Sequence, residues 1–255
     1  MVRPYPFVLA ALVALAAGAA HAGAGVNIRW DACLGDGGVL NKTFACNSNA
    51  GTRVIVTSFV VPATLTDFVG EVLFIDAATA SAALPNWWQY FNAGTCRQSS
   101  LGANFLVSAT AVACVDWSDG TKIGGIASYT VGTVGPNTAT IHTINAVPSA
   151  SYGTLSAGPE YFSTNLTMNS LKTVGVGACT GCSIPACIAL RQMLLYQNTP
   201  AGVTNTVTLT NPTNGTDSNV IVWQGGAGAS LPNAVCPQVV PTRRSSWNIV
   251  KQLYR

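Results

Sequence analysis

The stretch RVIVTSFVV at residues 53–61 is the clearest sign of how this chain of 255 residues folds. It is rich in valine and isoleucine, whose branched side chains fit the pleated surface of a sheet. Alternation of apolar and polar residues, broken by turn residues, recurs along the chain and predicts antiparallel strands. Further predicted strands cover residues 71–75, 104–114, 162–169 and 206–210.

Two segments are less regular. Around His142 the apolar positions change parity between residues 139–141 and residues 144–146, which predicts an inserted β-bulge or the end of a strand. In residues 188–197 two structures compete, because Pro185 suits the start of a helix whereas alternating apolar residues suit a strand. We predict a strand there.

Pairs such as Asp119-Gly120 and Asn214-Gly215 separate the predicted strands and suit tight turns. About eight to ten such strands indicate an all-β fold, an antiparallel β-sandwich of which the jelly roll is one type, stabilised by disulfides. We predict a signal peptide at residues 1–22 and a single β-sandwich domain at residues 23–240. Residues 241–255 are basic and aromatic and are predicted to form a short helix or a tail.

Residues 1–22 have the pattern of a secretory signal peptide. Arg3 is the only charged residue, a stretch of small residues and leucine follows, and Ala20-His21-Ala22 matches the small-x-small cleavage pattern. An uncleaved membrane anchor is the alternative, but the apolar stretch is shorter than the roughly 20 residues that a spanning helix needs. We therefore expect cleavage after Ala22, export to the periplasm, cell surface or medium, and no transmembrane helix in the mature chain.

The composition narrows the functional class. Charged residues make up 8% of the chain, against about 25% in typical soluble domains. Small and hydroxyl-bearing residues must therefore cover the surface, as they do in many extracellular β-proteins. The net charge of +3 does not suggest a nucleic-acid partner. Because His142 is the single histidine after the signal peptide, few catalytic constellations can form, and we predict no catalytic residue and no cofactor.

Every cysteine lies beyond the predicted cleavage site, and in an exported chain we expect all of them to form structural disulfides. Sequence order favours Cys33 with Cys46 and Cys96 with Cys114, and it leaves the pairing of the last four open. The cysteines are Cys33, Cys46, Cys96, Cys114, Cys179, Cys182, Cys187 and Cys236.

The sequence gives weaker support for two other functions of the last four cysteines. The CxxC spacing of Cys179 and Cys182 occurs in redox-active dithiols, but those lie at a helix N-terminus and this one is surrounded by glycines and strand patterns. With Cys187 and Cys236 the pair could ligate zinc, yet the second half of such a site is not a CxxC motif. We predict no metal site.

One turn combines two acids with an aromatic ring, and we take Asp116, Trp117 and Asp119 as candidate ligand-binding residues. Paired carboxylates beside an aromatic side chain suit a glycoside hydrolase, but bonding of each carboxylate to its own turn is the favoured alternative. Asp31 and Asp36 form a second acidic loop. Neither cluster supplies enough oxygens to indicate calcium.

The remaining candidates are an aromatic run and the histidine. In PNWWQYF, residues 85–91, we expect Trp88 to fill the core, while Trp87 either packs as well, which is favoured, or forms a surface platform for a ligand. His142 lies among threonines, and the chain has no GxSxG motif. We expect a solvated or hydrogen-bonded strand histidine rather than the base of a serine hydrolase.

The C-terminal segment has a helix-like pattern, in which Ser246 could cap a turn that carries Trp247, Val250 and Tyr254 on one face. Docking of this segment on the sandwich is the favoured interpretation. A signal for surface sorting or assembly is the alternative.

Several strings give the chain a resemblance to other proteins. The chain resembles an uncharacterised group of secreted bacterial proteins. The resemblance implies a bacterial envelope or extracellular location, and it transfers no activity, cofactor or catalytic residue. The strings are WWQ at 87–89, NAGTCRQ at 92–98, PTNGTDS at 212–218, WQGG at 223–226, and the ending from Trp247 to LYR.

We therefore expect an exported, non-catalytic β-sandwich with a structural, adhesive or ligand-binding function, and with a glycan or a cell-surface component as the partner class. A secreted glycan-active hydrolase that uses Asp116 or Asp119 is the first alternative. A subunit of an extracellular surface assembly, joined through strand edges, is the second.

Overall fold

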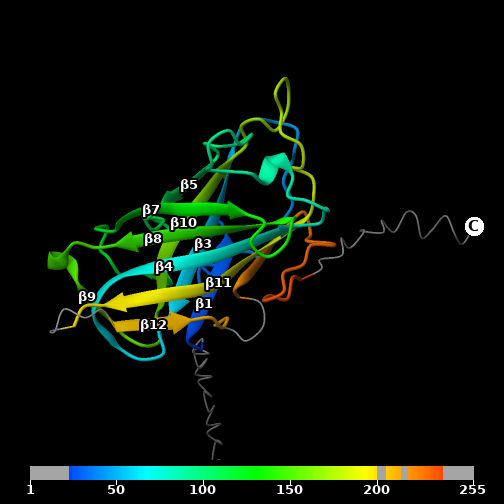
Figure 1. Ribbon diagram of the computed structural model, residues 1–255. Coiled ribbons are helices and arrows are strands. Elements are labelled where there is room, and N and C mark those ends of the chain that lie inside the picture. Colours follow the sequence, from blue (N-terminus) through cyan, green and yellow to red (C-terminus); the bar gives the residue numbers. More distant parts are fainter. Residues whose placement is uncertain (1–22, 200–204, 214–217, 238–255) are drawn as a thin grey trace, which may run out of the picture.

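The computed structural model describes residues 23–199, 205–213 and 218–237. In these ranges the protein is all-β, as predicted, with two short 3₁₀ turns at Asn86–Trp88 and Ser149–Ser151 and with no α-helix (Figure 1). No helix of the described residues has the length and apolar character to cross a bilayer. The predicted signal peptide and the segment 241–255 lie outside the described residues.

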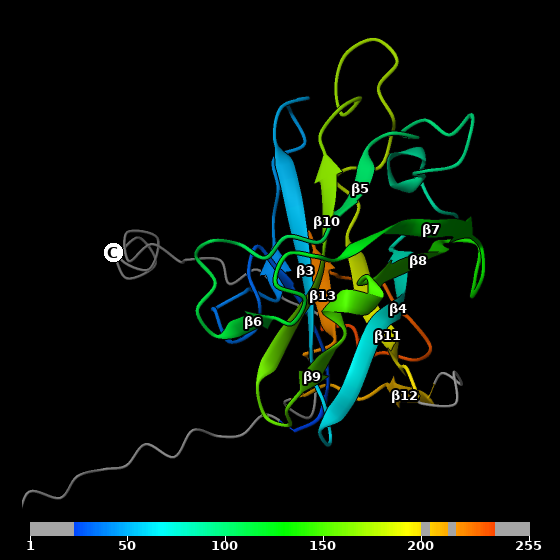
Figure 2. The same ribbon diagram turned by 90° about the vertical axis from the view of Figure 1, so that its left-hand side faces the viewer.

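The strands form two antiparallel-rich sheets that pack as a sandwich (Figure 2). Sheet A has the order β1-β3-β10-β5, with β6 parallel to β10, and sheet B has the order β2-β13-β11-β4-β8-β7, with β12 beside β11 and β9 beside β4. The jelly-roll subtype stays a prediction. The bounds in sheet A are β1 Gly25–Trp30, β3 Thr52–Val60, β5 Leu101–Asn104, β6 Cys114–Asp116 and β10 Glu160–Asn169. Those in sheet B are β2 Asn41–Lys42, β4 Leu65–Thr79, β7 Ile123–Val131, β8 Thr138–Ala146, β9 Gly153–Leu155, β11 Ala186–Gln197, β12 Asn205–Leu209 and β13 Val220–Trp223.

The core lies between the inner faces of the two sheets. Alternate residues of β3, β10 and β11 point inward, among them Ile55, Leu166 and Leu190, and each is at most 1% exposed. Burial of one such side chain contributes roughly 1.5–3 kcal/mol, so these rows hold the sheets together. The strand prediction for residues 188–197 is confirmed, because that run forms most of β11.

The predicted strand at residues 104–114 is wrong over most of its length. β5 ends at Asn104, whose side-chain oxygen accepts a hydrogen bond from the Leu106 N–H at 2.8 Å. Further on, the Ser108 hydroxyl oxygen accepts from the Thr110 N–H, and the Ser108 carbonyl accepts from Ala111. Local side-chain bonds thus replace sheet bonds, and residues 105–113 form a loop, called here the lid.

The bulge predicted near His142 is also wrong. β8 pairs with β4 in an uninterrupted register, and the irregular position lies in the neighbouring strand, between Ile126 and Ser128 of β7. The apolar parity changes because β8 turns the polar residues Thr143 and Asn145 toward the interior, at 0% and 1% exposure. The change of parity therefore comes from polar residues inside the sandwich and not from an extra residue in β8.

All eight cysteines form disulfides, which the sequence predicted, but both favoured pairings are wrong. The bonds are Cys33–Cys114, Cys46–Cys182, Cys96–Cys179 and Cys187–Cys236, and only the last joins two cysteines that follow one another in the sequence. The CxxC cysteines therefore have different partners and form neither a redox pair nor a zinc half-site. Four disulfides indicate an oxidising extracellular or envelope environment.

Two of these bonds hold the segment between β10 and β11, since Cys182 is tied to Cys46 and Cys179 to Cys96. Replacing Cys46 and Cys182 together by alanine should lower the free energy of unfolding by about 2–5 kcal/mol. The loss should exceed that of the Cys187→Ala/Cys236→Ala variant, because the first bond spans 136 residues and the second spans 49.

Urea unfolding of both variants and of the parent protein, with the other disulfides intact, measures the two losses. An equal or reversed order would contradict the expectation from loop length.

Candidate functional site

A pocket of about 260 Å³ lies on the outer face of sheet A, between the strands and the lid. Val54 and Val56 of β3 and Phe162 of β10 form its apolar floor, and Val107 and Ala111 of the lid face them. Polar groups surround this apolar centre. An apolar concave surface with a few polar groups is the usual character of a small-molecule site.

The lid is held in place at its C-terminal end. The Cys33–Cys114 disulfide ties it to the loop after β1. In that loop the Asp36 carboxylate accepts hydrogen bonds from the backbone N–H groups of Val112, Ala113 and Cys114 at 2.8–3.2 Å. Partial burial opposes ionisation, but these three donors prevail and lower the pKa of Asp36.

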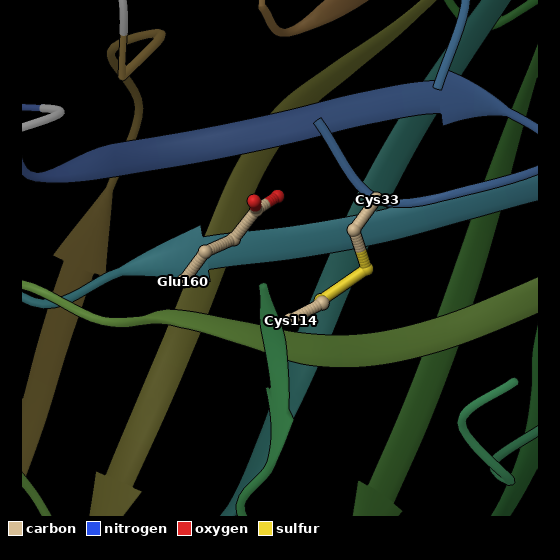
Figure 3. A group of neighbouring side chains, drawn as sticks. All are labelled: Cys33, Cys114 and Glu160. Carbon is tan, nitrogen blue, oxygen red and sulfur yellow. A yellow bond between two sulfur atoms is a disulfide. The ribbon is translucent and has the colours of Figure 1, made fainter. Parts of the chain in front are cut away.

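Glu160 fixes the other side of the same loop. Its carboxylate accepts from the backbone N–H groups of Leu34 and Gly35 at 3.0 and 2.7 Å, and from the side chains of Asn27 and Ser58. Figure 3 shows Glu160 beside Cys33 and Cys114, a grouping that resembles a metal site in composition. Both sulfurs are joined in a disulfide, so the grouping has no thiolate to offer a metal.

One polar atom of the pocket stands out. The Asn165 amide nitrogen donates to the Leu106 carbonyl of the lid at 3.1 Å. Its Oδ1 is buried and has no hydrogen-bond partner within the described parts of the chain. A buried acceptor without a donor costs about 1–3 kcal/mol. Because the atom itself is buried, a ligand donor reaches it when the Asn165 side chain shifts, and the new hydrogen bond then recovers that energy.

A second polar cluster lies inside the sandwich. Glu71 of β4 is fully buried, and its Oε1 accepts from Asn145 Nδ2 of β8 at 2.8 Å. Lys122, just before β7, reaches across to sheet A and donates to the carbonyls of Phe162 and Ser163 at 3.0 and 3.1 Å. Burial raises the pKa of Glu71, against the opposing effect of Lys122, and burial lowers the pKa of Lys122.

In the predicted acidic turn, Asp116 forms the local bonds of the favoured alternative, and ligand binding by Asp116 and Trp117 stays a prediction. Asp116 accepts from the N–H and hydroxyl of Ser118 and from the Gly120 N–H, as the favoured alternative stated. Burial opposes ionisation, but Ser118, Lys122 and Gly120 together lower the pKa of Asp116, so its carboxylate is poorly suited to act as a general acid. Trp117 is only 9% exposed and packs edge-on against Phe68. Asp119 is exposed at the turn, and its ligand-binding function stays a prediction.

The surface placement considered for Trp87 is wrong, and the favoured packing interpretation is confirmed. Both Trp87 and Trp88 are buried in an aromatic cluster that includes Trp223. Arg97, itself 1% exposed, lies with its guanidinium carbon 3.7 Å from the Trp87 ring centre and donates to the Trp87 carbonyl. Trp87 therefore has no surface to offer a ligand.

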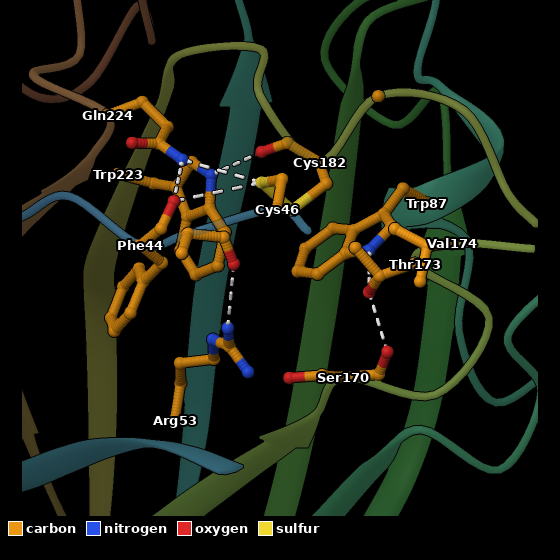
Figure 4. Close-up of a disulfide and its surroundings, with 12 residues drawn as sticks. Phe44, Cys46, Arg53, Trp87, Ser170, Thr173, Val174, Cys182, Trp223 and Gln224 are labelled. Carbon is orange, nitrogen blue, oxygen red and sulfur yellow. Dashed lines mark hydrogen bonds between the residues drawn. A yellow bond between two sulfur atoms is a disulfide. The ribbon is translucent and has the colours of Figure 1, made fainter. Parts of the chain in front are cut away.

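The Cys46–Cys182 disulfide lies at the edge of this aromatic cluster (Figure 4). The Trp223 indole donates to the Cys182 carbonyl at 2.7 Å, and the Gln224 amide donates to the Phe44 carbonyl at 2.8 Å. These contacts make this end of the sandwich a packing centre.

His142 lies on the outer face of sheet B, half-buried, with its ring edge-on to Phe74 at 4.4 Å. It contributes to neither cluster described above. His142 is a partly exposed residue of β8, which agrees with the expectation of a solvated or hydrogen-bonded strand histidine.

Sequence reasoning missed Asn165, Glu71, Lys122 and Asn145. The only signal for Glu71 was an acid in the apolar run of residues 68–75, and its neighbours in space come from other strands. Asn165 looked like one of several solvent-facing residues of a predicted strand.

Comparison with protein-family models finds no match, and no curated protein is similar to the chain. Functional conclusions therefore rest on the geometry of this molecule alone.

The bonds of Asp36 predict how the lid responds to acid. The carboxylate has a lowered pKa, so its stabilising bonds are complete above the ordinary aspartate pKa of 3.8 and are lost as the pH falls through the folded value. An Asp36→Asn substitution should loosen the lid at neutral pH, and the amides of residues 112–114 should exchange hydrogen roughly 10-fold faster, since about 1.4 kcal/mol corresponds to that factor.

Site-resolved hydrogen exchange measures this change, and Asp119→Asn, an exposed aspartate in another turn, is the control. Unchanged exchange in the Asp36 variant would show that the disulfide alone holds the lid.

Proposed function

We propose that the mature protein is an exported, non-catalytic binding module whose pocket beneath the lid takes a small, largely apolar ligand. The observation that carries the proposal is the preformed pocket of about 260 Å³, with its apolar floor and the unpartnered Asn165 Oδ1. A ligand with one N–H or O–H donor and an apolar ring fits this chemistry.

The charged residues of the pocket support a neutral ligand. Asp36 is engaged by three backbone donors, and Asp31 forms an ion pair with Lys42. A cationic ligand would have to compete with these bonds, and an anionic ligand would be repelled by both carboxylates. A neutral ligand, recognised by its shape and by one hydrogen bond, therefore fits the pocket better than a charged ligand.

The anchored lid supports binding without turnover. It is anchored by a disulfide and by Asp36, so little ordering is required when a ligand enters, which favours affinity. The same proposal includes cleavage of residues 1–22 and export to the envelope or the medium of a bacterium. The four disulfides support export, because disulfides persist in oxidising compartments. The glycan-active hydrolase and the surface-assembly subunit stay predictions without a specific contact in their favour.

Binding can be tested with indole as the probe and 1-methylindole as its matched control, because only indole has an N–H donor. Nuclear magnetic resonance titration should show shifts for residues of the lid and of β3. Indole should bind roughly 3- to 10-fold more tightly than 1-methylindole, as expected for one hydrogen bond of about 0.5–1.5 kcal/mol.

A Val54→Trp substitution fills the pocket from its floor and should abolish these shifts. Ile144→Trp, on the outer face of sheet B and 49% exposed in the parent protein, should leave them unchanged. Indole shifts that survive Val54→Trp, or equal affinity for the two probes, would count against the proposal.

A further inference from the structure

We propose that Lys122 and Asn145 form an intramolecular isopeptide bond, with Glu71 moving the proton between them. Glu71 and Asn145 lie in sheet B, Lys122 directly precedes its strand β7, and all three are buried in the sandwich. Glu71 and Asn145 are directly paired across β4 and β8, and Asn145 is paired with Gly124 of β7. Lys122 lies two residues before Gly124, so its side chain points to the same inner face.

The amine and the amide are held by neighbouring residues of sheet A. Lys122 Nζ donates to the Ser163 carbonyl at 3.1 Å, and Asn145 Nδ2 donates to the Thr164 hydroxyl at 3.3 Å. Both groups also face Glu71, through the hydrogen bond of Asn145 and through the electrostatic interaction of Lys122. Bond formation requires the Lys122 amine to leave the β10 carbonyls and turn toward the amide carbon of Asn145.

The surroundings exclude water and favour neutral groups. Glu71 and Asn145 are each 1% exposed, and Lys122 is 7% exposed. The aromatic rings of Phe162 and Trp117 lie 4.3 and 5.1 Å from the Lys122 Nζ. Transfer of a proton from the ammonium to the carboxylate yields a neutral amine and a neutral acid, and the pKa directions of Lys122 and Glu71 both favour that transfer.

The reaction balances without any further reagent. The free electron pair of Lys122 Nζ attacks Cγ of Asn145 while the Glu71 acid donates its proton to the amide oxygen. The Cγ–Nδ2 bond then breaks, and Nδ2 leaves as ammonia with protons returned through Glu71. Nζ thereby replaces Nδ2, and its remaining N–H can donate to Glu71 Oε1 as Nδ2 does now.

Two unpartnered atoms point to the same chemistry. Within the described residues, Glu71 Oε2 and Asn145 Oδ1 are buried and lack a hydrogen-bond partner. A protonated Glu71 can donate to Asn145 Oδ1, which both satisfies the pair and polarises the amide for attack. Asp116 also lies near Lys122, with Oδ1 3.6 Å from Nζ, but its ionised carboxylate resists attack by an amine.

The bond would tie down an exposed edge. β7 is the last strand of sheet B, and Ile123, directly after Lys122, is 68% exposed. A covalent link from residue 122 to β8 would keep this edge strand paired when the rest of the sheet opens.

Mass spectrometry of the exported mature protein, with its disulfides reduced, tests the inference directly. The intact chain should be lighter than its sequence by one ammonia, and proteolysis should yield a joined peptide that contains both Lys122 and Asn145. A chain of full mass would overturn the proposal. So would an ammonia loss that maps to the Asn214-Gly215 pair, or a water loss that joins Lys122 to Asp116.

Variants test the assigned residues. Glu71→Gln should restore the full mass, because glutamine fits the space but cannot accept and return the proton, and Lys122→Met should do the same. Lys172→Met, which changes an exposed lysine that donates to the Cys96 carbonyl, should retain the loss. A joined peptide that persists in Glu71→Gln would remove Glu71 from the reaction, and the parent protein's mass decides the bond itself whether or not the variants fold.

Discussion

The structure depends on charged side chains that form hydrogen bonds with the backbone. Asp36 holds three N–H groups of the lid, Glu160 holds two of the loop after β1, and Lys122 holds two carbonyls of β10. Arg97 bonds the carbonyls of Trp87 and Asn169 without a carboxylate partner in the described ranges. Such charge-assisted bonds are about twice as strong as neutral ones, and they fix loops that have no regular structure. A chain with 8% charged residues thus engages several of them in backbone bonds, which leaves few free charges on the surface.

The two ends of the sandwich are stabilised by different means. Where β10 ends and β11 begins, two disulfides and an aromatic cluster around Trp223 close the structure. Where β10 begins, Glu71, Asn145 and Lys122 join the sheets through polar contacts. Polar contacts between sheets depend on precise register, because a shift of one residue would turn these side chains outward. The uninterrupted register of β4 with β8 keeps Glu71 opposite Asn145.

The strands were predictable wherever one face is apolar. Residues 53–61 and 188–197 alternate cleanly, and both form strands. The lid has the same alternation, yet the side chain of Asn104 competes for the backbone and ends β5. The change of apolar parity near His142 led to a wrong prediction of a bulge, because Asn145 is polar but is buried against Glu71.

Disulfide pairing and the pocket were beyond the reach of the sequence because both depend on contacts between distant segments. Cys46 and Cys182 are 136 residues apart, and no local pattern relates them. The Asp116 turn was within reach, because its bonds span two to four residues. Long-range contacts require the sheet order, and sheet order cannot be derived from alternation alone.

The small number of free charges and the anchored lid together constrain which ligands this protein can recognise. Without a strong field there is little electrostatic steering, so association must rely on shape and on a few directed hydrogen bonds. The pocket supplies both, since its apolar floor belongs to the strands of sheet A and its free acceptor is Asn165 Oδ1. The disulfide and Asp36 order the lid in advance, and a preordered site loses less entropy on binding. The same backbone bonds of Asp36 that stabilise the lid therefore also favour a neutral ligand.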